Sequence, residues 1–406
     1  MKRKKYIVEA KRSAIGKFLG SLYEKDAVKV STQLIKNGFD EKHLKNVEMV
    51  ILGNVISSGM GQGLARAIAV NAGIDQKTPA YSINMVCGSG MQAIINACNE
   101  IECGKNLVLA GGVEFMSNIP YATNTFIRLG KKFGSFEMTD LMISDGLTDS
   151  FSGLHMGMTA ENIAKEYNIS REAQDDYSYL SQQRAIKAVD SDVFKDEIVP
   201  LELVDYKGRK SVFDTDEFPN RESTREKMSS LNPTFIKDGS GTITAANSSG
   251  INDGIAFVLV ASEDYCRENN LEPLAEIVES ATVGCDPQLM GLGPYYAIKE
   301  LLEKSQVDFK QIDRFEINEA FAAQVLGCFK LMEEEYDVDE KYIVDRCNVY
   351  GSGLGLGHPL GATGARITTT LVHEMKRDDN ITYGISSLCI GGGMGCALLL
   401  KKVKEW

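Results

Sequence analysis

Cys87 is the residue whose surroundings most favour chemistry. It lies in Asn-Met-Val-Cys-Gly-Ser-Gly at 84–90, where an extended segment runs into a glycine turn and then a helical pattern. Free backbone N–H groups and the helix macrodipole favour the thiolate there, so we expect an acidic, nucleophilic thiol. The position also suits a small buried core cysteine. The GSGMQA run at 88–93 resembles a dinucleotide-binding fingerprint, but its nearest acidic partner, Glu114, comes late.

Two further segments carry groups that suit acid–base chemistry. His358 lies in a glycine-dense run, YGSGLGLGHPLGATG at 350–364, and a histidine there can act as a base to a nucleophile. Cys389 begins CIGGGMG at 389–395, where a strand ends in glycines whose N–H groups suit an oxyanion site. The alternatives are a glycine-rich turn with an exposed histidine and a bulge that ends a strand. Together with Cys87, the three residues favour a catalytic site.

Three polar segments add candidate binding groups. Asn318 begins NEAFAAQ at 318–324 directly after a predicted strand, where α/β proteins place ligands, although it also suits a helix N-cap. The small, polar segment 244–254 suits a tight loop or hydrogen bonds to an amide-bearing ligand. The segment HMGMTAEN at 155–162 suits a helix start with Thr159 as its N-cap.

Apolar runs that alternate with helical patterns predict an α/β fold for the elements that position these groups. We expect strands at 6–10, 49–56, 80–84, 107–113, 255–260, 275–283, 314–317, 381–386 and 395–400. A faint repeat relates Gly90 and the strand from Leu107 to Gly364 and the strand from Ile381. The polar stretch at about 115–244 reads as an insertion with some helices between two similar halves.

Composition excludes several classes of protein. The 406 residues include 44 basic and 56 acidic side chains, a net charge of −12, which gives no general reason to bind nucleic acid or an anionic membrane. The start has no apolar segment of the kind found in signal peptides, and no long apolar run is present. Nine scattered cysteines indicate reduced thiols and a cytoplasmic location. No CxxC pair occurs, so we expect no metal site.

The ordered set of segments resembles the thiolase family over essentially the whole chain. It comprises NMVCGSG, HMGMTAEN, NSSGINDG at 247–254, NEAFAAQ, GHPLGATG at 357–364 and CIGGGMG. The resemblance implies a five-layer α/β/α/β/α core from two similar halves, with an inserted loop domain. We expect an N-terminal core half at 1–114, a loop domain with CoA contacts at 115–246 and a C-terminal core half at 247–406.

The resemblance also implies catalytic roles. Cys87 matches the nucleophile that accepts the acyl group, His358 the histidine that activates it, and Cys389 the acid/base that moves the α-proton. Asn318, acting through a water molecule, and His358 match one oxyanion hole. The N–H groups of Cys87 and Gly391 match the other.

The implied substrates are acetyl-CoA, acetoacetyl-CoA and CoA, with no separate cofactor. His155 and Ser249 match residues that contact pantetheine, and Arg221 resembles a residue near the nucleotide end. The apolar residues that match the lining around the acyl thioester are Met156, Phe235, Met290 and Phe321. The implied reaction is reversible condensation of two acetyl-CoA molecules by way of an acetyl-cysteine, with ping-pong kinetics. The family likeness also implies a homo-oligomer, either a tetramer or a dimer.

Some residues depart from the family pattern and leave alternatives open. Tyr350, Ser352, Gly353 and Gly355 are unusual before the histidine, as is GQGLAR at 61–66. No catalytic group is lost, but substrate fit and rate depend on these changes. A degradative 3-ketoacyl-CoA thiolase of broader chain length is the main alternative. A condensing enzyme of fatty-acid synthesis would have a histidine or asparagine in place of Cys389. A non-catalytic CoA-binding or thiol redox-sensing protein is the alternative from another class.

Overall fold

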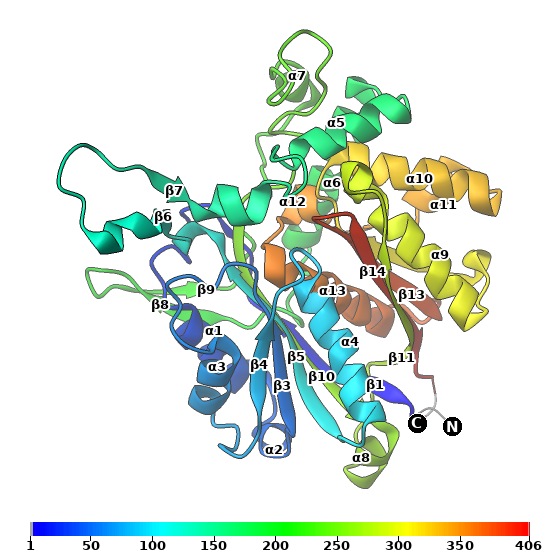
Figure 1. Ribbon diagram of the computed structural model, residues 1–406. Coiled ribbons are helices and arrows are strands. Elements are labelled where there is room, and N and C mark those ends of the chain that lie inside the picture. Colours follow the sequence, from blue (N-terminus) through cyan, green and yellow to red (C-terminus); the bar gives the residue numbers. More distant parts are fainter. Residues whose placement is uncertain (1–2, 405) are drawn as a thin grey trace.

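A bent sheet of ten strands forms the framework of the computed structural model, which describes residues 3–404 and 406 (Figure 1). The strand order is β12-β13-β14-β11-β1-β10-β5-β3-β4, and the short β2 pairs with β10. Each strand expected from the sequence is present, with ends shifted by a few residues. The strands are β1 (Lys5–Arg12), β2 (Gly16–Lys17), β3 (Met49–Gly53), β4 (Ala80–Ile83), β5 (Leu107–Phe115), β10 (Asn252–Ser262), β11 (Ala275–Gly284), β12 (Arg314–Ile317), β13 (Tyr383–Ile390) and β14 (Met394–Lys402).

The strand pairing confirms the repeat. β3 is parallel to β5, which is antiparallel to β10, which is antiparallel to β1. In the second half β12 is parallel to β13, which is antiparallel to β14, which is antiparallel to β11. A short antiparallel pairing of β1 with β11 joins the halves. The domain boundary expected at residue 247 needs one correction, because β10 lies between β1 and β5 in the N-terminal half. The order of strands along the chain does not reveal which strands are neighbours in the sheet.

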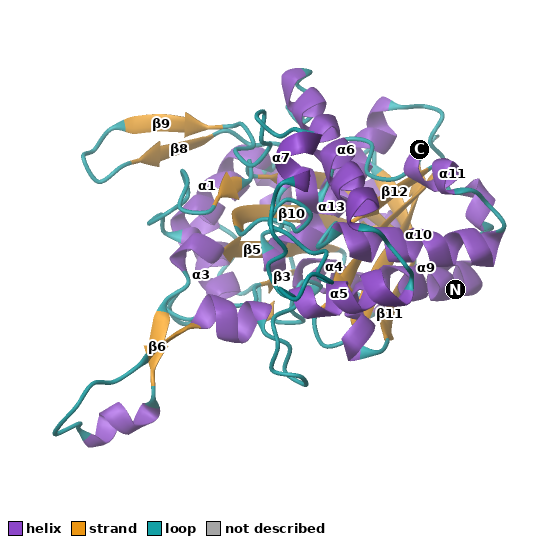
Figure 2. Ribbon diagram, turned by 90° about the horizontal axis from the view of Figure 1, so that it is seen from above, coloured by secondary structure: helices purple, strands orange, loops and turns teal. Residues whose placement is uncertain are grey.

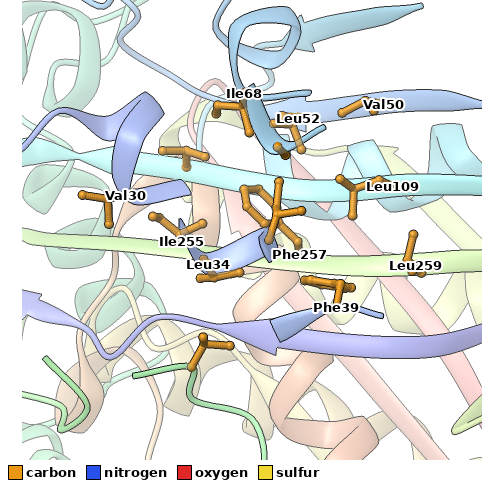
Figure 3. Packing of buried hydrophobic residues seen from close by; sticks show 14 of the residues in the cluster. Val30, Leu34, Phe39, Val50, Leu52, Ile68, Leu109, Ile255, Phe257 and Leu259 are labelled. Carbon is orange, nitrogen blue, oxygen red and sulfur yellow. The ribbon is translucent and has the colours of Figure 1, made fainter. Parts of the chain in front are cut away.

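Helices cover both outer faces and fill the space between the half-sheets, which gives the five expected layers. In the middle lie α4 (Ser89–Glu102) and α13 (Thr363–Arg377), which contact each other and strands of both halves. Along β3, Ile51 faces this middle layer, as strand alternation requires. Val50 and Leu52 face the outer helices instead (Figure 3). The outer helices are α1 (Ala27–Gly38) and α3 (Leu64–Ala72) on one side, and α9 (Gly293–Ser305) and α10 (Ala322–Tyr336) on the other.

The expected insertion carries helices and two hairpins that project from the core (Figure 2). Its regular elements are β6 (Tyr121–Thr123), β7 (Met138–Asp140), a π-helix (Met142–Leu147), α5 (Gly157–Glu166), α6 (Arg171–Asp190), β8 (Leu201–Val204), β9 (Lys210–Phe213) and α7 (Arg225–Ser229). The remaining α-helices are α2 (Glu41–Leu44), α8 (Glu263–Glu268), α11 (Glu340–Val344) and α12 (Gly353–Leu356). Among the described residues, no helix has the length and apolar character to cross a membrane.

Candidate active site

A strained turn between β4 and α4 presents the Cys87 thiol. Val86 has a φ of 46°, in the left-handed region that β-branched residues rarely adopt. The Ser89 hydroxyl holds this turn, since it accepts from the Met85 N–H at 2.8 Å and donates to the Val86 carbonyl at 2.6 Å. A Cβ at Gly88 would lie 2.4 Å from Ile390 Cδ1, so a larger residue directly after the cysteine would require the Ile390 side chain to move. The turn therefore fixes the thiol at the start of α4.

The Cys87 thiol is less acidic than the sequence indicates. Desolvation by burial raises its pKa to about 11, and the Glu114 carboxylate acts in the same direction. Hydrogen bonds from the backbone N–H groups of Gly391 and of Cys87 itself lower the pKa but do not offset the desolvation. The expected acidic thiol is therefore wrong for the free protein. At neutral pH the thiol is protonated and needs a base before it can attack.

His358 is the predicted base, and its hydrogen bonds define its tautomer. The Thr363 hydroxyl donates to the Pro359 carbonyl at 2.8 Å, so its oxygen accepts from His358 Nδ1–H at 2.7 Å. Nε2 is then the unprotonated nitrogen. Burial and the nearby Arg366 guanidinium lower the pKa of His358 to about 3, which keeps the imidazole neutral. A neutral imidazole that lines the same cavity as a protonated thiol has the protonation state that a general base needs.

Asn318 contacts this imidazole at the end of β12. Its Nδ2 lies 3.3 Å from His358 Nε2, and its backbone N–H donates to the Ser387 carbonyl on β13 at 2.9 Å. Its buried Oδ1 has no hydrogen-bond partner among the residues that the structure describes. The helix that follows, α10, begins only at Ala322, so Asn318 does not cap it. The structure therefore excludes the N-cap interpretation, and it places the fully buried Asn318 side chain against His358 and outside the cavity lining.

Cys389 and the glycines after it approach from β13. Cys389 is buried near the end of the strand, and burial followed by the charge of the Cys87 thiolate raises its pKa well above the usual value. Gly392 and Gly393 have φ values of 88° and 80°, a backbone that glycine adopts without strain. This turn directs the Gly391 N–H to the Cys87 sulfur. Both thiols and the donor pair expected from the sequence therefore meet at one place.

A small, mostly apolar cavity of about 180 Å³ joins these groups. Its lining contains nearly all the predicted site residues: Cys87, His155, Met156, Phe235, Ser249, Met290, Phe321, His358, Cys389 and Gly391. The sequence reasoning missed other lining residues, mostly small or apolar: Val86, Met116, Gly146, Leu147, Ser248, Gly250, Ile251, Ala320 and Leu360. Gly146 and Leu147 come from the π-helix, an element often found at functional sites.

His155 and Phe235 form one wall of the cavity. Their rings stack with centroids 4.7 Å apart at 27°. A Cβ at Gly157 would collide with the Phe235 ring, so this glycine allows the stack. His155 Nδ1 accepts from the Gly157 N–H at 3.1 Å, and burial lowers the pKa of the histidine. The neutral ring thus keeps its second nitrogen as a donor for a ligand amide.

Two predicted site residues, Asn318 and Arg221, do not belong to the cavity lining. Asn318 is fully buried against His358, whereas Arg221 lies on the surface. Its guanidinium is exposed and binds the Asp190 carboxylate at 2.6 Å, on α6. It does not belong to the cavity lining, which leaves its role toward a nucleotide as a prediction. Among the described residues, no cluster of three or more His, Cys, Asp or Glu side chains is placed to hold a metal ion.

Four of the residues that depart from the family pattern, Tyr350, Ser352, Gly353 and Gly355, lie in and beside α12, and the 61–66 segment leads into α3. The Ser352 hydroxyl accepts from the buried Arg366 at 3.0 Å. A Cβ at Gly355 would lie 2.6 Å from the Ser181 carbonyl on α6, so this glycine allows α12 to pack closely against α6. Neither residue, nor Tyr350 or Gly353, belongs to the cavity lining. These departures therefore adjust the packing of α12 and do not replace a group of the site.

The fold of two repeated halves places two cysteines and a histidine at one cavity. Two family models match the chain: the thiolase N-terminal domain over residues 5–264 and the thiolase C-terminal domain over residues 271–402. The chain belongs to the thiolase family.

Similar proteins share nearly the full length of the chain. An acetyl-CoA acetyltransferase of Cupriavidus necator is 44% identical over 399 residues, 98% of each chain. The crystal structure of a Bacillus anthracis acetyl-CoA acetyltransferase is 41% identical, with a TM-score of 0.91 over 99% of each chain. A human mitochondrial 3-ketoacyl-CoA thiolase, crystallised in complex with CoA, is 40% identical, with a TM-score of 0.90 over 99% of this chain and 98% of its own.

Proposed function

We propose that this thiolase is an acetyl-CoA C-acetyltransferase, which condenses two acetyl-CoA molecules to acetoacetyl-CoA and CoA and catalyses the reverse cleavage. One observation carries the proposal: a protonated Cys87 thiol, a neutral His358 and a second thiol, Cys389, meet at one small apolar cavity. The similar proteins named for acetyl transfer support the choice of the acetyl group.

The first half-reaction acetylates the enzyme. His358 Nε2 takes the Cys87 proton as the sulfur attacks the thioester carbonyl of acetyl-CoA. The N–H groups of Cys87 and Gly391 stabilise the oxyanion that forms on the thioester. Both groups already donate to the Cys87 sulfur, which supports this role. The carbon–sulfur bond to CoA then breaks and the CoA thiolate takes the proton of Cys389, so that an acetyl-cysteine, a Cys389 thiolate and a protonated His358 remain.

The second half-reaction forms the carbon–carbon bond. Cys389, as the thiolate, takes an α-proton from a second acetyl-CoA. Donors from protonated His358 and from a water molecule on Asn318 stabilise the enolate oxygen, a role consistent with the buried contact of these two side chains. The enolate carbon attacks the acetyl group, and Cys87 leaves and regains a proton. Acetoacetyl-CoA and the free enzyme result.

The substrate thioester occupies the cavity, with its pantetheine along the wall made by His155, Phe235 and Ser249. The CoA part that these residues contact belongs to the substrate, so we propose no separate cofactor. The small cavity and the side chains of Met156 and Met290 within it favour an acetyl over a longer acyl group. A degradative 3-ketoacyl-CoA thiolase of broader chain length is the second candidate, favoured by the human relative.

Cleavage of 3-ketoacyl-CoA substrates by CoA tests this proposal. We expect rapid cleavage of acetoacetyl-CoA and a steep fall of kcat/KM for the six-carbon and eight-carbon substrates. Equal or rising kcat/KM with chain length would favour the degradative enzyme. Absence of cleavage with every substrate, by a folded protein, would contradict both.

We also propose that the protein is a homo-oligomer, a tetramer or a dimer, in the cytoplasm. The β6–β7 arm projects from the core (Figure 2). It supports the first part, because large apolar side chains are exposed on it, among them Phe126, Leu129 and Phe133. Nine unpaired cysteines favour a reducing compartment. Light scattering of the purified protein gives the mass directly, and a monomer at micromolar concentration would contradict the oligomer.

A further inference from the structure

Glu319 is a buried carboxylate directly after Asn318 that the reaction steps above do not use. We infer that Glu319 is a positioning residue: it locks Asn318 and the turn before His358 into one rigid arrangement. The inference rests on the proposed function, because its readout is the rate of the reaction.

The insertion supplies the first two contacts of this carboxylate. On α6, the Ser181 hydroxyl donates to Glu319 Oε2 at 2.6 Å and the Tyr177 hydroxyl donates to Oε1 at 3.1 Å. Both hydroxyls are buried, so neither bond is exchanged for water at the surface. Glu319 thereby fixes the end of β12 to a helix of the insertion.

The turn that leads to His358 supplies three more donors. The backbone N–H groups of Ser352 and Leu354 donate to Glu319 Oε2 at 3.2 and 3.1 Å. Asn348 Nδ2 donates to Oε1 at 2.8 Å, while the same amide group pairs with both backbone groups of Ile317. The carboxylate therefore accepts five hydrogen bonds, all from neutral donors, and holds the first turn of α12.

These contacts close a ring around the catalytic pair. α12 ends at Leu356, and Gly357 with a φ of 106° leads into His358, whose Nε2 returns to Asn318 Nδ2 at 3.3 Å. The fit is tight, because a Cβ on Gly353 would lie 2.6 Å from the Glu319 carbonyl and 2.8 Å from Asn318 Oδ1. A shift of α12 would move both catalytic side chains, and misplacement by about 1 Å can cost about 100-fold in rate.

Glu319→Gln tests the inference with little change in volume. The glutamine amide replaces one carboxylate oxygen with an NH₂ group, which donates and cannot accept. It faces either the three donors at Oε2 or the two donors at Oε1, so the hydrogen bonds on that side are lost. We expect kcat for acetoacetyl-CoA cleavage to fall by about 10- to 100-fold, while KM for CoA changes by less than about twofold.

A matched control separates positioning from general stability. Glu161 on α5 is also buried and accepts hydrogen bonds from the backbone N–H groups of Thr242 and Ile243, away from α12. Glu161→Gln should lower the melting temperature as Glu319→Gln does, yet keep kcat within about threefold of the wild type. Wild-type kcat in Glu319→Gln, or equal losses of kcat in both variants, would overturn the inference.

A second variant covers failure of Glu319→Gln to fold. Tyr177→Phe with Ser181→Ala removes two of the five donors and keeps the carboxylate. It should lower kcat by about two- to tenfold with KM unchanged, and wild-type kcat would again overturn the inference. An inactive wild-type enzyme would contradict the proposed function itself, which keeps the two failures distinct.

Discussion

Thr363→Val removes the group that orients the His358 imidazole, the proposed base, and keeps the shape of the side chain. Thr363 Oγ1 accepts from His358 Nδ1–H at 2.7 Å, in a fully buried place that no solvent can reach. In the variant the Nδ1–H has no acceptor, so the tautomer with a free Nε2 loses its stabilisation. An unsatisfied buried donor costs about 1–3 kcal/mol, which corresponds to about 5- to 150-fold in rate.

Single-turnover acetylation of Cys87 measures this loss. We expect the rate constant for acetyl transfer from acetyl-CoA, followed by quenched-flow mass measurement, to fall by about that factor. The wild-type rate should also be nearly constant from pH 5 to pH 8, because the pKa of the thiol is about 11 and that of His358 is about 3. Neither group titrates between these values.

Thr368→Val is the matched control on the same helix. Its hydroxyl is also buried, donates to the Gly364 carbonyl at 2.8 Å and lies 3.0 Å from the Ser386 hydroxyl, without contact to His358. The control should lose stability but acetylate at nearly the wild-type rate. Equal rates in Thr363→Val and the wild type would refute the assigned tautomer.

Three further variants probe other parts of the account. Cys389→Ala should still acetylate Cys87 but condense about 10²- to 10⁴-fold more slowly, as loss of a positioned acid/base predicts; condensation at the wild-type rate would contradict its role. Arg221→Ala should raise KM for CoA substrates and leave pantetheine thioesters unchanged, and equal effects on both would remove it from the nucleotide end. Burial raises the pKa of Glu114 from 4.5 to about 7, so the folded state binds its proton more tightly than the unfolded state does. The contribution of Glu114 to the free energy of unfolding therefore falls by about 3 kcal/mol as pH rises from 4.5 to 7, and Glu114→Gln should lack this fall; wild-type and variant stability curves that run parallel over this pH range would contradict it.

The sequence predicts the core strands because they are buried on both faces. β5 and β10 are fully buried along their length, and such strands are continuous apolar runs in the sequence. The β6–β7 and β8–β9 hairpins are absent from the prediction, since their exposed, mixed side chains lack that pattern. Strand neighbours are equally invisible, which explains the misplaced boundary at β10.

The sequence likewise predicts some features of the candidate site and not others. Cys87, His358 and Cys389 stand out because glycines crowd around each of them in the sequence. The low pKa expected for Cys87 failed because desolvation depends on neighbours from other segments, which outweigh the helix terminus. Glu319 was missed because its partners lie far along the chain, so no local spacing marks it.

Acetylation of Cys87 is the central claim, and intact-mass measurement after incubation with acetyl-CoA tests it most directly. The wild type should gain about 42 Da on one site, which peptide mapping places at Cys87, and added CoA should remove it. Cys87→Ala should gain no mass. Acetylation of another residue, or the same gain in Cys87→Ala, would contradict the account.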